Sequence, residues 1–201
     1  YLRALSWLPA ANPATGASLA TASVGVASVV TLYKALRSWG ANRFGALFGA
    51  ISFGLSSHVW LYHTQPEVFA LNHLVAGLIL WFAGPNAPAT GRERIVLLGL
   101  IAGLGLSNHH TIIFTAPIGL WGVYRAVLEQ EGSALATLGL GAGGLVAGLT
   151  PYLYLPVVHA FESSWHWGAP TDLAGIAHHF LRRDYGTFQM TSGESPTPAG
   201  V

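Results

Sequence analysis

Histidine, asparagine and glutamate side chains interrupt the apolar segments of this chain at a few points. His58 and His63 precede a turn at residues 65–67, and a second polar group occupies residues 107–110. If the apolar segments are helices that cross a bilayer alternately, both groups fall at the same membrane surface. Ionisable residues at such depth are costly to bury and commonly mark a site. The sequence therefore predicts one polar site on one face of a membrane protein.

The composition supports a membrane location. Hydrophobic residues make up 52% of the chain and charged residues 8%, against about 25% charged residues in an ordinary soluble domain. The net charge of +1, without a basic stripe, predicts no nucleic-acid partner. The absence of cysteine excludes disulfides and thiolate metal sites. The first residue is Tyr1, so we expect a fragment of a longer protein.

Six apolar stretches predict transmembrane helices when about 20 residues are taken as one span. They cover residues 17–36, 44–62, 67–83, 94–107, 111–128 and 134–157. The fourth is short and glycine-rich, and is either a tilted span or half of a broken helix. The predicted fold is an all-α polytopic bundle over residues 1–158, with a polar extracytoplasmic tail at 159–201 that contains one short amphipathic helix near 171–183. The glycine runs at 99–105 and 139–148 lack the lysine of a phosphate loop and predict packing surfaces.

Lysine and arginine gather at the span ends opposite to the polar turns. Six lie there: Lys34, Arg37, Arg43, Arg92, Arg94 and Arg125. Three lie on the other side: Arg3, Arg182 and Arg183. Cytoplasmic loops carry the excess of basic residues. The bias therefore predicts that both polar turns and the tail lie on the periplasmic or luminal face.

The two polar turns supply most of the candidate site residues. Glu67 either caps the helix that follows it or acts as a general base or substrate anchor. Adjacent histidines on a helix point about 100° apart. We therefore expect one of His109 and His110 to face the site and the other to cap a helix end. Asn108 has both a donor and an acceptor, which suits a sugar hydroxyl or a phosphate oxygen, or a bond between two helix ends.

The remaining histidines have simpler alternatives. His58 and His63 are either part of the site or interfacial side chains that reach toward water. His73 lies inside a predicted helix and is expected to form a hydrogen bond between helices.

The tail contains a second polar group. Arg183 is suited to bidentate contact with phosphate, or to anionic lipid headgroups. Trp167 is expected to stack on a sugar ring or to anchor the tail at the membrane surface. Tyr185 lies close to Arg183 in the sequence and joins the same candidate group.

Four ordered motifs carry a family resemblance. They lie at residues 55–72, 103–110, 151–156 and 166–188, where the last pairs His-Trp-Gly-Ala-Pro with Arg-Asp-Tyr-Gly-Thr-Phe. Together they resemble a bacterial family of polytopic membrane proteins. That family is related to the animal membrane O-mannosyltransferase that modifies IPT domains of receptors, in the GT-C class of glycosyltransferases.

The resemblance implies a sugar transferase in a bacterial inner membrane, with its site on the periplasmic face. The expected donor is a polyprenyl-phosphate sugar. The other expected partners are membrane lipids, an acceptor protein or glycan, and further subunits of a membrane complex. Glu67 and His109 are the candidate catalytic residues. The candidate substrate-binding residues are His58, Asn108, His110, Trp167, Arg183 and Tyr185. No metal ligand or further cofactor is predicted, and the need for a divalent cation stays open.

Two departures from the family pattern leave alternatives open. The family's acidic first-loop motif would lie before Tyr1, and Ala169 stands where the family usually has aspartate. The missing motif and Ala169 favour a non-catalytic accessory or scaffold subunit of a membrane complex. A third hypothesis is a transport or redox subunit with histidine ligands to haem or metal, for which His58 and His110 are the pair to consider.

Overall fold

The computed structural model describes residues 13–130, 132–160 and 172–181. Every element in these ranges is helical, which confirms the predicted all-α class. The elements are α1 (Pro13–Ser38), α2 (Arg43–Leu55), α3 (Ser57–Thr64), α4 (Phe69–Ala83), α5 (Gly91–Asn108), the 3-10 helix η2 (His110–Thr115), α6 (Ala116–Leu128), α7 (Ala134–Gly148), the 3-10 helix η3 (Thr150–Leu153), α8 (Tyr154–Ala160) and α9 (Leu173–Phe180).

Three described helical stretches are long and apolar enough to cross a membrane. They are Pro13–Ser38, His110–Leu128 and Ala134–Val157. The α2–α3 pair makes a fourth if it is one broken span, because the two helices meet at a bend of 64°. The bend lies at Ser56, whose extended backbone ends α2 and begins α3. The helices confirm an integral membrane character, and the count of six spans stays a prediction.

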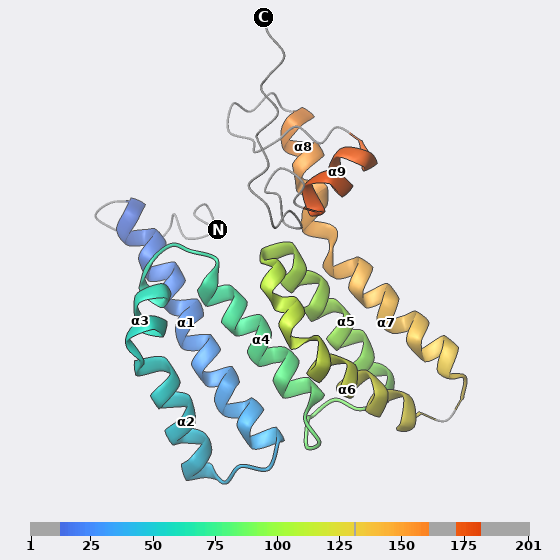
Figure 1. Cartoon of the computed structure of the whole chain (residues 1–201), viewed down its shortest axis with the longest axis horizontal. Helices are drawn as coiled ribbons and strands as arrows, with labels where there is room; N and C mark the ends of the chain where they lie inside the picture. The colour runs from blue at the N-terminus through green and yellow to red at the C-terminus, as the bar shows by residue number, and fades with distance from the viewer. Residues whose placement is uncertain (1–12, 131, 161–171, 182–201) are drawn as a thin grey trace, which may run out of the picture. The chain divides into compact units, whose positions relative to one another are not determined.

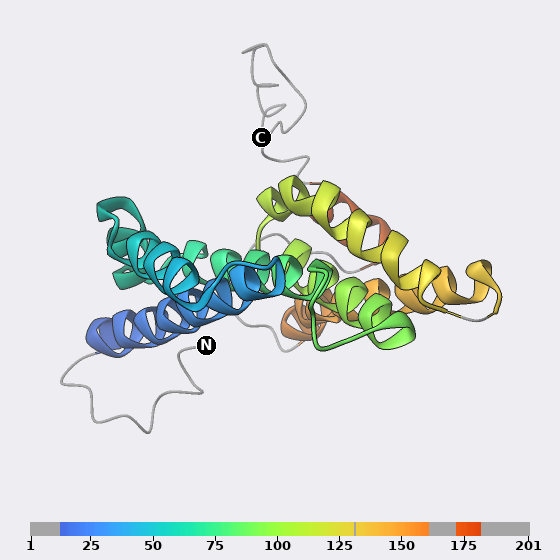
Figure 2. The same ribbon diagram turned by 90° about the horizontal axis from the view of Figure 1, so that it is seen from below.

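The helices before Thr150 form one compact unit. Within it α1 packs against α2 and α4, α4 packs against α5, and α5 packs against α7. Helix α6 contacts both α4 and α5, and Figure 2 shows it on one side of these two helices. The buried core lies where α4, α5 and η2 meet, at Val75, Ile79, Ala83, Leu98, Ile101 and Ile112.

A second unit begins at Pro151. Its helix α9 starts at a cap in which the Asp172 carboxylate accepts a hydrogen bond from the Gly175 N–H at 2.7 Å. The ring of Tyr152 lies edge-on to Phe180, with the centroids 5.4 Å apart. Helix α9 falls within the range predicted for an amphipathic helix. The predicted boundary between bundle and tail, after residue 158, stays a prediction.

Large apolar side chains cover the outside of the first unit. Phe44, Phe114 and Leu135 are 86%, 81% and 79% exposed. A soluble monomer rarely exposes large continuous apolar patches, whereas a helix in a bilayer faces lipid with such residues. The distribution agrees with the membrane location predicted from composition.

Glycine allows α5 and α7 to touch through their backbones. A Cβ atom on Gly99 would collide with the carbonyl oxygen of Gly141, and one on Gly103 would lie 2.8 Å from the Cα of Gly148. Small residues permit this close approach of membrane helices, which dispersion forces then stabilise. The prediction that both glycine runs are packing surfaces is confirmed.

A buried ion pair links the start of α5 to the end of α6. Arg94 is 1% exposed, and its guanidinium lies 3.3 Å from a carboxylate oxygen of Glu129. The same carboxylate pairs with Arg125 at 3.1 Å and accepts the Gly91 N–H at 3.0 Å. Arg94 also donates to the carbonyl of Gly84 at 3.1 Å. The sequence analysis placed Arg94 among the basic residues at the span ends. In the structure its buried side chain links the Gly84 carbonyl to the Glu129 carboxylate.

The α5–α7 contact generates a first prediction. Gly103→Ala should lower the free energy of unfolding by about 1–3 kcal/mol, because the new methyl group meets backbone that cannot move aside. The matched control is Gly139→Ala on α7, where a Cβ meets nothing within 4 Å. The control should be neutral or slightly stabilising, since alanine favours a helix over glycine. Thermal unfolding in detergent compares the two, and equal melting temperatures would contradict the packing described.

The ion pair generates a second prediction. Glu129→Gln should destabilise the protein by about 1–3 kcal/mol, because it leaves the buried Arg94 guanidinium without a counter-charge. Glu93→Gln removes an exposed carboxylate from the first turn of α5 and should change stability by less than about 0.5 kcal/mol. Denaturation of both variants in the same detergent measures the difference. Equal stability would show that Glu129 does not hold the loops together.

Candidate functional site

The two polar turns predicted from the sequence meet in space. One is the turn at residues 65–68 between α3 and α4, and the other is the junction between α5 and η2. The side-chain amide of Asn108 donates to the carbonyl of Val68 at 3.1 Å. Figure 1 shows both turns at one end of the first unit, away from the loops that precede α2, α5 and α7. Asn108 thus ties two helix ends together, which was one of its two predicted roles.

Glu67 lies in the exposed part of this turn. Helix α4 begins at Phe69, not at residue 67, and Val68 occupies its N-cap position without a side-chain hydrogen bond. The first turn of α4 contains no acidic residue. The structure therefore does not support the interpretation of Glu67 as a helix cap. Its carboxylate is exposed beside the residue that Asn108 binds.

His109 lies between α5 and η2, as the C-cap of the first and the N-cap of the second. Its backbone is extended (φ −156°, ψ 132°), and its N–H donates to the carbonyl of Gly105 at 2.8 Å. Its Nδ1 accepts a hydrogen bond from the Thr111 N–H at 3.3 Å, which caps η2. The imidazole centroid lies 6.0 Å from that of Phe69 at the start of α4. His109 is thus the capping member of the histidine pair, while His110 is the half-buried first residue of η2.

Two further polar residues, Asn72 and Thr111, complete this junction, and neither was among the predicted site residues. The hydroxyl oxygen of Thr111 lies 2.8 Å from Nδ1 of His109. The amide nitrogen of Asn72 lies 3.2 Å from the same hydroxyl oxygen. The Oδ1 atom of Asn72 is buried and has no hydrogen-bond partner within the described ranges. An asparagine inside an apolar helix was the one signal that could have identified Asn72.

The other histidines form a separate buried pair. His63 Nε2 lies 3.0 Å from His73 Nδ1, which confirms the predicted helix–helix hydrogen bond of His73. His63 is 7% exposed, so the expectation that it reaches toward water is wrong. A Cβ atom on Gly25 would lie 2.7 Å from the His63 ring, so α1 has room for the ring because residue 25 is glycine. His58 is exposed on α3.

The described residues give no support for a bound metal or haem. Within these ranges, no three histidine, aspartate or glutamate side chains are placed to hold a metal ion. The two imidazoles that contact each other are His63 and His73, whereas the haem hypothesis names His58 and His110. A separation of 3.0 Å is that of a hydrogen bond.

Several predicted site residues lie outside the described ranges. They are Trp167, Arg183 and Tyr185, together with Ala169. Their predicted parts in the site stay predictions.

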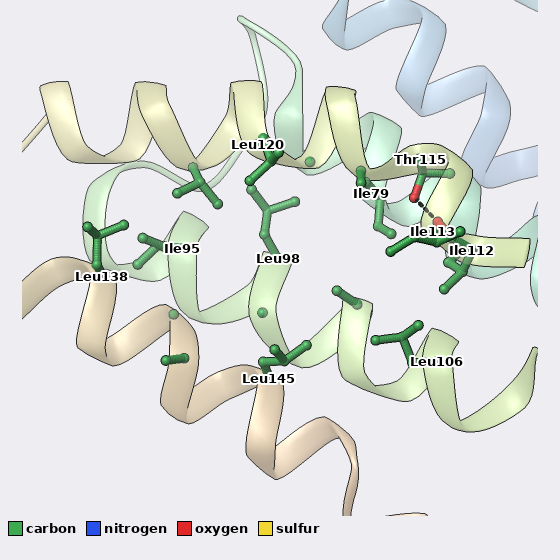
Figure 3. Close-up of a pocket in the computed structure, with 17 residues that line it drawn as sticks. Ile79, Ile95, Leu98, Leu106, Ile112, Ile113, Thr115, Leu120, Leu138 and Leu145 are labelled. Carbon is green, nitrogen blue, oxygen red and sulfur yellow. Dashed lines mark hydrogen bonds between the residues drawn. The ribbon is translucent and has the colours of Figure 1, made fainter. Parts of the chain in front are cut away.

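An apolar pocket of about 340 Å³ lies next to the polar junction. It is lined from α4, α5, η2, α6 and α7, and Figure 3 shows Leu98, Leu106 and Leu145 among its hydrocarbon side chains. Thr115 also lines the pocket, and its hydroxyl donates a hydrogen bond to the carbonyl of Ile112 at 2.7 Å. A wall of this kind suits a hydrocarbon chain rather than a sugar. The sequence analysis did not predict the pocket.

Comparisons with known proteins confirm the predicted relation to the animal O-mannosyltransferase. A family model described as the protein O-mannosyl-transferase TMEM260 N-terminal domain matches residues 2–132. Protein O-mannosyl-transferase TMEM260 of Mus musculus is 34% identical over 175 residues, which cover 84% of this chain and 25% of the mouse protein. The Dictyostelium discoideum protein of the same name is 27% identical over 192 residues, or 88% of this chain and 23% of its own length. This chain thus spans about a quarter of the length of these curated relatives. No solved structure gives a significant match.

The histidine pair generates a third prediction. His73→Leu should destabilise the protein by about 1–3 kcal/mol, because it leaves a buried nitrogen of His63 without its partner. The double variant His63→Leu/His73→Leu removes both polar groups and should recover much of that loss. Thermal unfolding of both single variants and of the double variant measures the coupling. Additive effects of the two substitutions would contradict a hydrogen bond between the imidazoles.

Proposed function

This chain belongs to the protein O-mannosyl-transferase TMEM260 N-terminal domain family, and we propose on that basis that it is part of a membrane glycosyltransferase. The observation that carries the proposal is the family match over residues 2–132. That range includes Glu67, Asn108, His109 and His110. The transferred sugar in our proposal is mannose, as the printed names of the relatives suggest.

The proposed architecture is a GT-C-like bundle of six spans. Successive passes would be α1, the α2–α3 pair, α4, α5, η2 with α6, and the stretch that begins with α7. Figure 1 supports this order, because helices of the first unit that follow one another in sequence run in alternating directions. We place the bundle in a bacterial inner membrane with both polar turns on the periplasmic face. The basic residues at the other span ends support this orientation.

The proposed donor is a sugar linked to a polyprenyl phosphate. The apolar pocket supports this choice, because Ile112 and Ile113 line it and follow closely on His109 in the chain. A polyprenyl chain in the pocket would place its phosphate near the polar junction. The acceptor would be a hydroxyl of a protein or glycan that approaches from the water side.

The proposed reaction is displacement at the anomeric carbon of the sugar. The acceptor oxygen forms a bond to that carbon and loses its proton, while the bond to the phosphate oxygen breaks and polyprenyl phosphate leaves. Glu67 would act on the acceptor side, as general base or as a positioning carboxylate. Asn108 and His109 would bind sugar or phosphate, and Arg183 would bind the phosphate. His58, His110, Trp167 and Tyr185 are proposed contacts to substrate.

A second candidate is a non-catalytic subunit of a membrane complex. Ala169 favours it, because a methyl group stands where the resembling family usually has a carboxylate. Both candidates place the chain in the membrane, so only a transfer assay separates them.

The fourth prediction concerns transfer by the full-length protein. Membranes that contain it should move radiolabel from a polyprenyl-phosphate sugar to a macromolecular acceptor. Glu67→Gln, His109→Ala and Arg183→Ala should each reduce the rate by about 100-fold or more while the protein stays folded. Glu93→Gln is the control, because this exposed carboxylate belongs to the first turn of α5, at the other end of that helix from His109.

The outcomes separate the hypotheses. Wild-type rates in both His109→Ala and Arg183→Ala would refute the site assignment. Absence of label with every donor, from a folded sample, would favour the non-catalytic subunit. A parallel reaction with EDTA tests for a divalent cation, since loss of transfer that Mg²⁺ or Mn²⁺ restores would establish the requirement.

A further inference from the structure

Three exposed basic side chains surround the turn between α1 and α2, and no acidic residue accompanies them. Lys34 and Arg37 lie near the end of α1, and Arg43 begins α2. No aspartate or glutamate occurs in the sequence before Glu67, which lies at the other end of the first unit (Figure 1). Within the described ranges the ion pairs are those of Glu129, so none of the three cations has a carboxylate partner there. The turn therefore carries an unbalanced positive charge.

The two arginines of this turn keep hydrogen-bond donors for a ligand. The Lys34 ammonium lies 4.6 Å from the ring centroid of Trp81 on α4, a cation–π contact that occupies it. Arg37 uses one guanidinium nitrogen to donate to the carbonyl of Ala41. A guanidinium has five N–H donors, and that of Arg43 has no partner within the described ranges. Arginine is the side chain best suited to bidentate contact with a phosphate group.

A stripe of exposed apolar side chains runs along α2 from the same turn. It consists of Phe44, Leu47, Phe48, Ile51 and Leu55, whose spacing places them on one face of the helix. These residues line a groove of about 710 Å³. Arg43 lies four residues before Leu47, so the two are neighbours on the helix surface. The α2 stripe thus has a cation at its beginning and hydrocarbon along the rest of its length.

The dimensions of the α2 stripe match one leaflet of a bilayer. From Phe44 to Leu55 it is about 16 Å long, at about 1.5 Å per residue. The hydrocarbon of one leaflet is about 15 Å thick, half of a core of about 30 Å. Trp39 in the adjoining turn is 43% exposed, and tryptophan is enriched where a helix meets the headgroup region. With the turn at headgroup level, the stripe spans one leaflet.

We propose that the α1–α2 turn and the α2 stripe bind one anionic phospholipid. Arg37 and Arg43 hold its phosphate group, and an acyl chain lies along the stripe. Any lipid could cover the apolar side chains, but the unbalanced positive charge selects an anionic headgroup. A zwitterionic lipid brings its own cation to the arginines, which offsets the attraction. The site lies at the other end of the first unit from the polar turns, so it does not depend on the proposed transfer activity.

Native mass spectrometry of the full-length protein in detergent tests the choice of headgroup. The protein is titrated with phosphatidylglycerol and, separately, with phosphatidylcholine that has the same acyl chains. We expect phosphatidylglycerol to bind about tenfold more tightly or better. Its affinity should fall about fivefold for each arginine removed in Arg37→Gln, in Arg43→Gln and in the double variant, because one basic residue near an anionic surface contributes about that factor. Equal affinity for the two lipids would overturn the proposal.

A matched control separates this site from a general attraction between basic residues and anionic lipid. Arg92→Gln removes an exposed cation from the first turn of α5, at the same end of the unit, where Glu93 balances the charge. It should leave the phosphatidylglycerol affinity at the wild-type value. A loss equal to that of Arg43→Gln would overturn the proposal. Equal melting temperatures of all variants without lipid show that they are folded.

Photolabelling of the wild-type protein tests the position of the acyl chain without any substitution. Phosphatidylglycerol with a diazirine in one chain should label peptides from residues 43–55, as identified by mass spectrometry. Excess phosphatidylglycerol should prevent the labelling, whereas glycerol phosphate, which has no chain, should not. Labelling only elsewhere would overturn the proposal, and competition by glycerol phosphate would reduce the site to one for a free anion. A lipid-free dimer that Phe48→Ser dissociates would assign the stripe to a second copy of the chain instead.

Discussion

A helix leaves amides and carbonyls unpaired at its ends, and wherever it ends out of reach of water these groups must find partners inside the protein. At the α5–η2 junction His109 supplies both a backbone donor for Gly105 and a side-chain acceptor for Thr111. Asn108 meets the carbonyl of Val68 before α4. The polar residues that could do chemistry are thus the residues that complete the backbone. Function and helix termination draw on the same side chains at this end of the molecule.

The opposite end solves the same problem with charge. Glu129 accepts from Arg94, Arg125 and the Gly91 amide, while Arg94 reaches the carbonyl of Gly84. These polar groups beside an apolar core thus pair with one another. A buried ion pair of this kind contributes little net stability but strongly penalises arrangements that separate it. It fixes the loops at this end of the first unit.

The periodicity and composition of the sequence predicted the helical class, the use of both glycine runs as packing surfaces, and the placement of the two polar turns on one face. Each follows from a local pattern that has few structural solutions in a membrane. Other features depend on which helices become neighbours, and a local sequence pattern does not predict which helices pack together. The buried Arg94 pairs with Glu129 from a distant loop, and the His63–His73 pair joins α3 to α4. Thr111 looked like an ordinary apolar-segment residue because its partners, Asn72 and His109, come from two different helices.

The contact between Gly25 and the His63 ring has an evolutionary consequence. A side chain at position 25 would occupy the space of the imidazole, since even a Cβ there lies 2.7 Å from the ring. Positions 25 and 63 should therefore change together as homologous chains diverge. A sequence that acquires alanine or valine at the first position would be expected to carry a smaller residue at the second, and to have lost the bond to position 73 as well. Covariation between two residues of separate helices would then record a steric fit rather than a shared chemical role.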